Sequence, residues 1–165
     1  MATHSPRGYS ALQIVLHWTI AALVILQLLF GESMTTVIDA SEEGTKVSAQ
    51  DQFLGSAHYW VGLAVLGLVL IRLLLRVTSG VPQAAGARGW MSTAASAMHW
   101  AFYALLVAMP VTGLLTYFDI ADLGELHAIG KPVFIVFILV HAAAALLHAI
   151  VLRDGTLRRM IAPAR

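Results

Sequence analysis

The 165-residue sequence contains no cysteine and few charged residues. Without thiols, the chain cannot form disulfides, bind iron–sulfur clusters or attach a c-type haem covalently. Only 12% of the residues are charged, whereas soluble domains contain about a quarter. Hydrophobic residues make up 59% of the chain, and the mean hydropathy is +0.79. A soluble fold this apolar would expose large hydrophobic patches, so the composition indicates a membrane protein.

Four long apolar spans dominate the chain, at about residues 11–30, 53–75, 94–118 and 124–152. Each span holds about 20 residues or more, enough for a helix to cross about 30 Å of hydrocarbon. The strands of a membrane β-barrel would be shorter and would alternate in polarity. The sequence therefore predicts an all-α, integral membrane four-helix bundle that forms a single domain over residues 1–165, with a Gly- and Pro-rich linker at residues 78–88.

The charges predict how the bundle is oriented. All arginines fall in the two tails or between the second and third spans, at Arg7, Arg72, Arg76, Arg88, Arg153, Arg158, Arg159 and Arg165. The other two connections hold only Lys46 and Lys131 as cations, together with eight of the nine acidic residues. The positive-inside rule then places both termini in the cytoplasm. We expect the first span to be retained, because no A-x-A cleavage site follows it.

Six of the seven histidines lie in or beside the apolar spans: His17, His58, His99, His127, His141 and His148. Histidine is expensive to place in a bilayer and commonly marks a cofactor, ion or proton site. On the fourth span His127, His141 and His148 are 14 and 7 residues apart, which returns each to within about 40° of the same helix face. One stripe of this helix therefore presents three imidazoles.

Depth in the membrane sorts these histidines into pairs. With the predicted orientation, His58 and His127 lie near the outer surface, whereas His17 and His141 lie nearer the cytoplasm. Two bis-histidine haems stacked across the membrane satisfy this arrangement, about 20 Å apart along the membrane normal. Axial ligands from different helices suit haem better than zinc, which requires four clustered ligands. We therefore predict two non-covalent haems.

Four further polar residues lie near the predicted cytoplasmic side. His99 and His148 either flank a quinone head group and pass protons to it, or are interfacial histidines bonded to backbone or water. Arg72 either pairs with a haem propionate or a quinone, or is a positive-inside anchor, and the same two readings apply to Arg76.

Several motifs resemble those of the bacterial cytochrome b561 family, four-helix di-haem membrane cytochromes. They are Tyr9–Trp18 (YSALQIVLHW), His58, Arg72–Arg76 (RLLLR), Ala108–Gly113 (AMPVTG), His141–His148 (HAAAALLH) and Arg153–Met160 (RDGTLRRM). The resemblance covers nearly the whole chain. It implies haem b ligation by His17, His58, His127 and His141, location in the bacterial inner membrane, and a superoxide oxidase-like oxidoreductase that passes electrons to ubiquinone.

The acidic outer connections do not suit superoxide oxidation, because a positive entrance would be needed to attract the superoxide anion. Only Lys131 beside His127, or Lys46, would supply one locally. The outside partner is therefore either a small redox substrate or a redox protein, and no nucleic acid partner is expected. Two alternatives remain. One is a cytochrome b subunit that anchors a dehydrogenase or hydrogenase and passes its electrons to quinone. The other is a histidine-lined proton or metal-ion transporter without haem.

Overall fold

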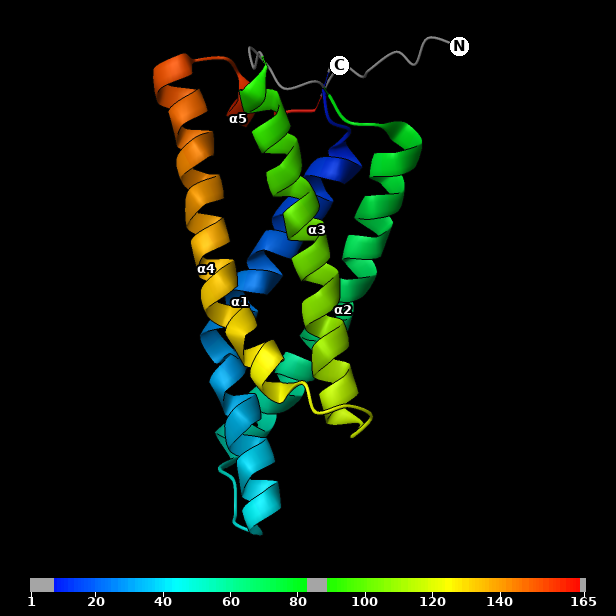
Figure 1. Ribbon diagram of the computed structural model, residues 1–165, viewed down its shortest axis with the longest axis vertical. Helices are drawn as coiled ribbons and strands as arrows, with labels where there is room; N and C mark the ends of the chain where they lie inside the picture. Colours follow the sequence, from blue (N-terminus) through cyan, green and yellow to red (C-terminus); the bar gives the residue numbers. More distant parts are fainter. Residues whose placement is uncertain (1–7, 83–88, 164–165) are drawn as a thin grey trace.

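Four long helices dominate the computed structural model, which describes residues 8–82 and 89–163. In chain order they are α1 (Ala11–Glu43), α2 (Ala49–Ser79), α3 (Trp90–Tyr117) and α4 (Gly124–Leu147). A π-helical turn (His148–Leu152) extends α4 and is followed by the short helix α5 (Thr156–Arg159). Successive long helices run in opposite directions, and the start of α1 lies at the same end of the bundle as α5 (Figure 1). Each long helix is long and apolar enough to cross a membrane, which confirms the predicted four-helix membrane fold.

The hairpin between α1 and α2 is longer than hydropathy predicts. We expected helices to end near residue 30 and to resume near residue 53, whereas α1 continues to Glu43 and α2 begins at Ala49. Hydropathy reports where a chain leaves the hydrocarbon, and a helix with satisfied backbone hydrogen bonds can continue into water. Gly44 ends α1 in the left-handed conformation with φ +67°, and Ser48 caps α2. These helices therefore project beyond the α3–α4 connection (Figure 1).

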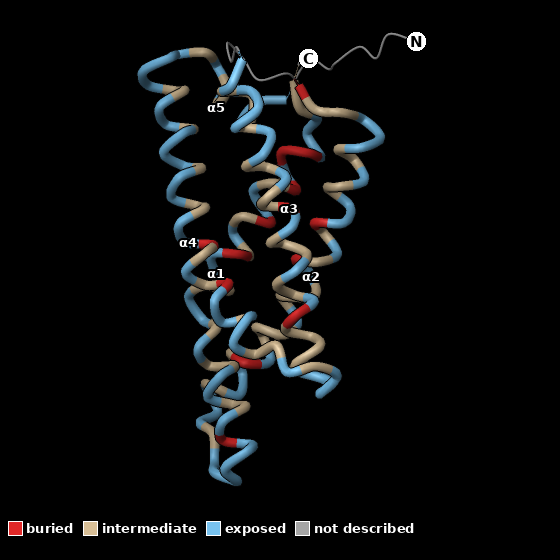
Figure 2. The backbone as a smooth tube through the Cα atoms, in the orientation of Figure 1, coloured by how far each residue is buried: buried red, intermediate tan, exposed pale blue. Residues whose placement is uncertain are grey.

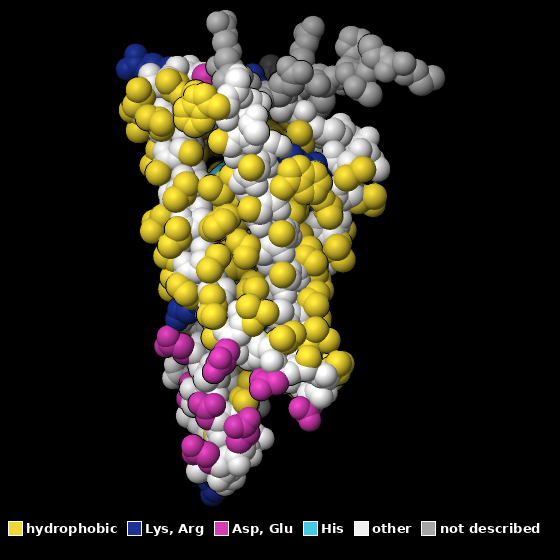
Figure 3. All heavy atoms as spheres, viewed as in Figure 1, with side chains coloured by type: hydrophobic (Ala, Val, Ile, Leu, Met, Phe, Trp, Pro, Cys, Tyr) yellow, Lys and Arg dark blue, Asp and Glu magenta, His cyan; other side chains and the backbone are white. Residues whose placement is uncertain are grey.

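Buried residues lie along the interior of the bundle (Figure 2), and hydrophobic side chains cover most of the visible outside between its two ends (Figure 3). The exposed fraction of Leu139 is 64% and that of Val136 is 57%, as expected for side chains that face lipid. Aliphatic and aromatic side chains from all four long helices form the core: Ile20, Val24, Val65, Val69, Tyr103 and Phe134. Along α1, α2 and α4, these core residues lie between the predicted depth of the His58–His127 pair and that of the His17–His141 pair.

Close backbone packing joins α1 to α2, α2 to α3 and α3 to α4. Gly55 of α2 allows a close approach to α1, because an added Cβ atom there would lie 3.0 Å from Val37 Cγ2. Over the described ranges, no comparable backbone packing joins α4 to α1 or α2. Residues of α4 therefore meet these two helices through long side chains, among them its histidines.

Charge separates along the long axis of the bundle. Acidic side chains gather over the α1–α2 hairpin and the α3–α4 connection, whereas arginines lie at the end that carries the termini (Figure 3). This separation agrees with the charge pattern from which the orientation was predicted. Arg7, Arg88 and Arg165, and residues 83–88 of the predicted linker, lie outside the described residues. Thr78 and Ser79 of that linker belong to α2.

Candidate functional site: two pairs of histidines

The first pair lies toward the acidic end of the bundle, where α2 faces α4. The ring centroids of His58 and His127 are 6.1 Å apart, and the rings are nearly perpendicular, at 85°. The structure therefore brings together the two histidines that depth in the membrane had paired. They reach each other across helices whose backbones do not pack closely.

The backbone of α3 fixes the tautomer and position of His127. Its Nδ1 lies 2.8 Å from the carbonyl oxygen of Met109, which can only accept a hydrogen bond, so Nδ1 carries the proton. The buried Thr112 hydroxyl lies 3.3 Å from the same nitrogen. Gly113 leaves room for the ring, because a Cβ atom there would lie 2.9 Å from His127 Cε1. The unprotonated Nε2 is thereby left with its lone pair, as a metal ligand requires.

His58 is held less completely than its partner. Its Nδ1 is buried and has no hydrogen-bond partner among the described residues. An unsatisfied buried ring nitrogen is costly, and such atoms in native proteins commonly face a bound group. The backbone is better fixed, since Gln27 of α1 donates to the carbonyl oxygen of His58 at 2.8 Å. An added Cβ on Gly31 would meet the His58 ring at 3.4 Å, an ordinary contact.

The second pair lies toward the arginine-rich end. The ring centroids of His17 on α1 and His141 on α4 are 6.3 Å apart, with an angle of 58° between the rings. His99 of α3 also lies against His141, with centroids 5.6 Å apart, and Phe102 packs on the same ring at 5.3 Å. The sequence had grouped His99 with His148. No ring contact or hydrogen bond within the described ranges joins those two residues.

Arg72 of α2 contacts α1 at Gln13, which lies one helical turn before His17. Its Nη1 donates to the carbonyl oxygen of Gln13 at 2.8 Å, and the Gln13 side chain donates to Gly80 at 3.2 Å. These bonds fasten the start of α1 to the end of α2. They use only one of the five N–H groups of the guanidinium, which leaves donors for an anionic group beside His17.

His148 forms an ion-pair contact at the π-helical turn. Its Nδ1 lies 2.5 Å from Asp154 Oδ2, and the Asp154 side chain is only 10% exposed. Burial raises the pKa of the Asp154 carboxyl, but hydrogen bonds from His148 and Thr156 outweigh it and lower the pKa to about 2. Asp154 is therefore a carboxylate at neutral pH and accepts the Nδ1 proton of His148, so Nε2 can exchange a proton with a ligand. The sequence had treated Asp154 only as the single acid outside the external loops.

The geometry of both pairs fits haem. A ring nitrogen binds a metal at about 2 Å, so two imidazoles on opposite sides of one iron have centres about 6 Å apart. The two measured separations, 6.1 and 6.3 Å, match this value. The unsatisfied His58 nitrogen and the single free lone pair of His127 fit it as well. A zinc site needs more ligands in one place, and the described residues contain no group of three or more His, Cys, Asp or Glu side chains arranged to hold an ion.

The predicted local positive charge near the first pair is neutralised. Lys131 Nζ lies 2.7 Å from Glu32 Oε1, which links α4 to α1 at the acidic end. A lysine whose charge is matched by a carboxylate adds little attraction for an anion. The suggestion that Lys131 supplies a positive entrance beside His127 is therefore wrong.

The family model for prokaryotic cytochrome b561 matches residues 8–163, which include all the histidines of the two pairs. The chain belongs to this family. It is similar to cytochrome b562 of Cereibacter sphaeroides, with 35% identity over 94% of this chain and 96% of the relative. It is also similar to a probable superoxide oxidase, CybB, of Yersinia pestis (29% identity, 94% and 96% covered). A further relative is cytochrome b561 homolog 1 of Escherichia coli (26% identity, 93% and 96% covered).

Membership in the cytochrome b561 family confirms the resemblance seen in the sequence motifs. At this level the chain is a multi-pass membrane cytochrome that binds haem b and transfers electrons, and it is an oxidoreductase. Sequence reasoning missed the Met109 carbonyl, Gly113 and Asp154. Pro110 and the AMPVTG motif mark the part of α3 that contains the first two, but their role depends on how α4 approaches α3.

Replacing Gly113 with alanine tests whether the first pair needs this close approach. Its Cβ atom would lie 2.9 Å from the His127 ring, so we expect the ring to shift and the purified protein to lose haem. Gly124→Ala is the matched control, because its Cβ would make an ordinary 3.6 Å contact with Thr116. A pyridine haemochrome assay measures haem per chain. Equal haem content in the two variants would contradict a packed ligand position at His127.

Proposed function

We propose that the chain transfers electrons across the bacterial inner membrane, between a redox partner on the outer side and the ubiquinone pool. Its cofactors in this proposal are two b haems, one held by His58 and His127 and the other by His17 and His141. The observation that carries the proposal is the presence of two facing histidine pairs with nearly equal separations, 6.1 and 6.3 Å. On α4 the members of the two pairs are 14 residues apart, or about 21 Å of helix.

A bound b haem supplies one-electron chemistry by cycling its iron between the ferric and ferrous states. The protein's part is to hold and orient the ligands. The Met109 carbonyl accepts the Nδ1 proton of His127, which orients the ring and leaves the Nε2 lone pair for the metal. At the second pair, Arg72 provides a positive charge and free donors beside His17, suited to a propionate.

The quinone end of the proposed route lies near His148. Reduction of a quinone to a quinol takes up two electrons and two protons, so a proton donor is needed there. The Asp154 carboxylate accepts the Nδ1 proton of His148 and orients its ring, in the manner of a carboxylate–histidine pair. His99 has a different place in the proposal, because it contacts His141 rather than His148. It supports the second pair as a neighbouring ring.

The outer partner is constrained by charge. The name of the Yersinia pestis relative points to superoxide for that protein. In this chain, acidic side chains gather at the proposed outer end (Figure 3), and Lys131 is paired with Glu32. This field repels anions, so we propose a neutral or cationic outer partner. Stopped-flow measurement of haem reduction by superoxide tests this charge argument. Repulsion predicts that the rate rises as added salt screens the acidic side chains, so a rate that falls with salt would contradict it.

The decisive experiment for the proposed function is the haem content of the purified chain. We expect two b haems per chain in the pyridine haemochrome assay, normalised to protein by amino-acid analysis. Fewer than two would overturn the di-haem proposal, and a colourless protein would favour a histidine-lined transporter. A stoichiometric partner that copurifies in mild detergent would instead favour an anchor subunit of a dehydrogenase or hydrogenase.

A further inference from the structure

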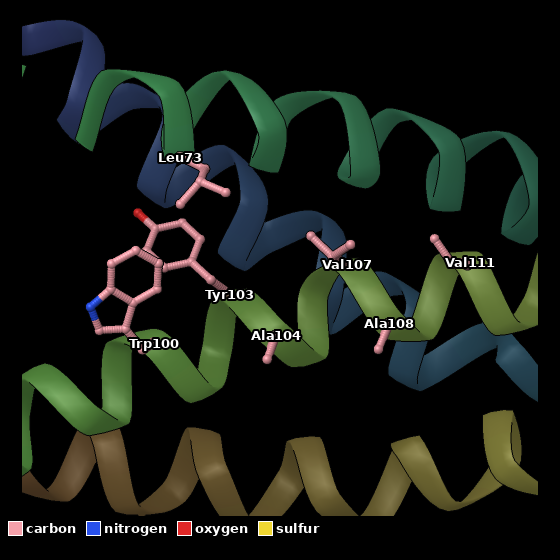
Figure 4. A pocket seen from close by; sticks show the side chains of 7 residues that line it. All are labelled: Leu73, Trp100, Tyr103, Ala104, Val107, Ala108 and Val111. Atoms are coloured by element: carbon pink, nitrogen blue, oxygen red, sulfur yellow. The ribbon is translucent and has the colours of Figure 1, made fainter. Parts of the chain in front are cut away.

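An apolar groove lies on the outside of the bundle between α2 and α3, and no histidine is among the residues that line it. Its volume is about 390 Å³. Aliphatic and aromatic side chains line it: Leu73, Trp100, Tyr103, Ala104, Val107, Ala108 and Val111. Figure 4 shows Trp100, Tyr103 and Leu73 at one end and Val111 at the other. The floor is shallow at Ala104 and Ala108, whose small side chains are exposed on the lipid side of α3.

The positively charged side chain of Arg76 lies at the Trp100 end of this groove. The Arg76 guanidinium carbon lies 5.2 Å from the centre of the Trp100 ring and 5.6 Å from the centre of the Tyr103 ring. Aromatic faces orient a guanidinium but do not neutralise its charge. Within the described ranges, no carboxylate forms a salt bridge with Arg76 and no hydrogen bond uses its N–H groups. The groove therefore begins at an oriented cation whose charge is not matched.

The length of the groove indicates what occupies it. Its residues on α3 extend from Trp100 to Val111, which is about 16 Å of helix. One leaflet of a bilayer has about 15 Å of hydrocarbon, so the groove extends over one leaflet. Arg76 lies in the last turn of α2, at the arginine-rich end of the bundle, where anionic headgroups gather on the cytoplasmic side of a membrane.

We propose that this groove binds one anionic phospholipid, with its phosphate on Arg76 and an acyl chain along Leu73, Ala104 and Ala108. The proposal does not depend on the identity of the redox partners. A zwitterionic lipid would place the same acyl chain in the groove, but its headgroup, which has no net charge, would be attracted less strongly to Arg76 and it would bind more weakly. The preference for a negative headgroup is therefore the property that the site predicts.

Native mass spectrometry of the purified holoprotein, titrated with phosphatidylglycerol or phosphatidylcholine of the same acyl chains, tests this proposal. We expect the protein to retain one phosphatidylglycerol roughly fivefold more tightly than phosphatidylcholine, the preference that one arginine provides. Arg76→Gln should remove the preference and leave weak binding of both lipids. Ala104→Leu should weaken both lipids, because the new side chain fills the groove.

Two matched variants control for general effects. Arg153→Gln removes a charge near the same end but away from the groove, and Ala22→Leu enlarges an exposed alanine on α1. Both should bind lipid as the unmodified protein does. The proposal is overturned if Arg153→Gln abolishes the preference as fully as Arg76→Gln, or if ubiquinone displaces the bound lipid. Loss of haem in Arg76→Gln would also overturn it, because Arg76 would then hold a propionate.

Discussion

His58→Ala is expected to lose one of two b haems and to keep the other. The substitution removes one ring of the first pair, and His127 alone cannot supply both axial ligands. The second pair stands on α1 and α4, and neither His17 nor His141 contacts His58 in the described structure. The pyridine haemochrome content should fall from two to one per chain, while quinol should still reduce the haem that remains.

Double variants distinguish this outcome from general misfolding. If His58 and His127 serve one haem, then replacing both should leave one haem, as each single replacement does. Replacing His58 together with His17 should instead remove both, since each pair loses a member. The effects are thus non-additive within a pair and additive between pairs. Loss of both haems from His58→Ala alone would count against separate sites.

Depth in the membrane is the reason that sequence reasoning paired these histidines. In a helical membrane protein, the distance of a residue from the end of its span fixes its level along the normal, because the rise per residue is constant. Neighbouring helices run antiparallel through short connections, so levels on different helices can be compared from the sequence alone. His58 with His127 and His17 with His141 follow from that comparison, and the structure places these side chains together.

The rest depends on which helix faces which, and depth does not determine that. His99 has the depth of the arginine-rich end, but only the position of α3 beside α4 places it on His141 rather than near His148. The bond from His127 to the Met109 carbonyl and the space over Gly113 depend on the same contact. The long α1–α2 hairpin was missed for another reason, since hydropathy does not report helix ends. Gly44 and Ser48 were the capping residues that could have revealed it.

The pair formed by His148 and Asp154 gives the second large expected effect. Asp154→Asn keeps the size of the side chain but removes the negative charge, and its single acceptor oxygen can take the place of only one of the two carboxylate oxygens that face His148 Nδ1 and the Thr156 backbone N–H. We expect electron transfer to quinone to slow by about 10- to 100-fold, the usual cost of losing an orienting carboxylate behind a functional histidine. Haem content should be unchanged. Asp119→Asn is the matched control at the opposite end, where asparagine tolerates the φ of +54°.

Asp154 itself should not titrate in the working range of pH. Its folded pKa of about 2 lies below the ordinary value of 3.8, so its interactions stabilise the fold above about pH 4. That contribution is lost only as the pH falls through this interval toward 2. Asp154 therefore stays ionised between pH 5 and 8, and in this range a slower quinone step in Asp154→Asn reports the loss of the charge beside His148 and not a change in the protonation of Asp154. Identical rates and pH profiles for the two proteins would mean that this pair does not deliver protons to quinone.

A double variant tests whether the carboxylate acts through the histidine. If it does, Asp154→Asn combined with His148→Gln should be no slower than His148→Gln alone.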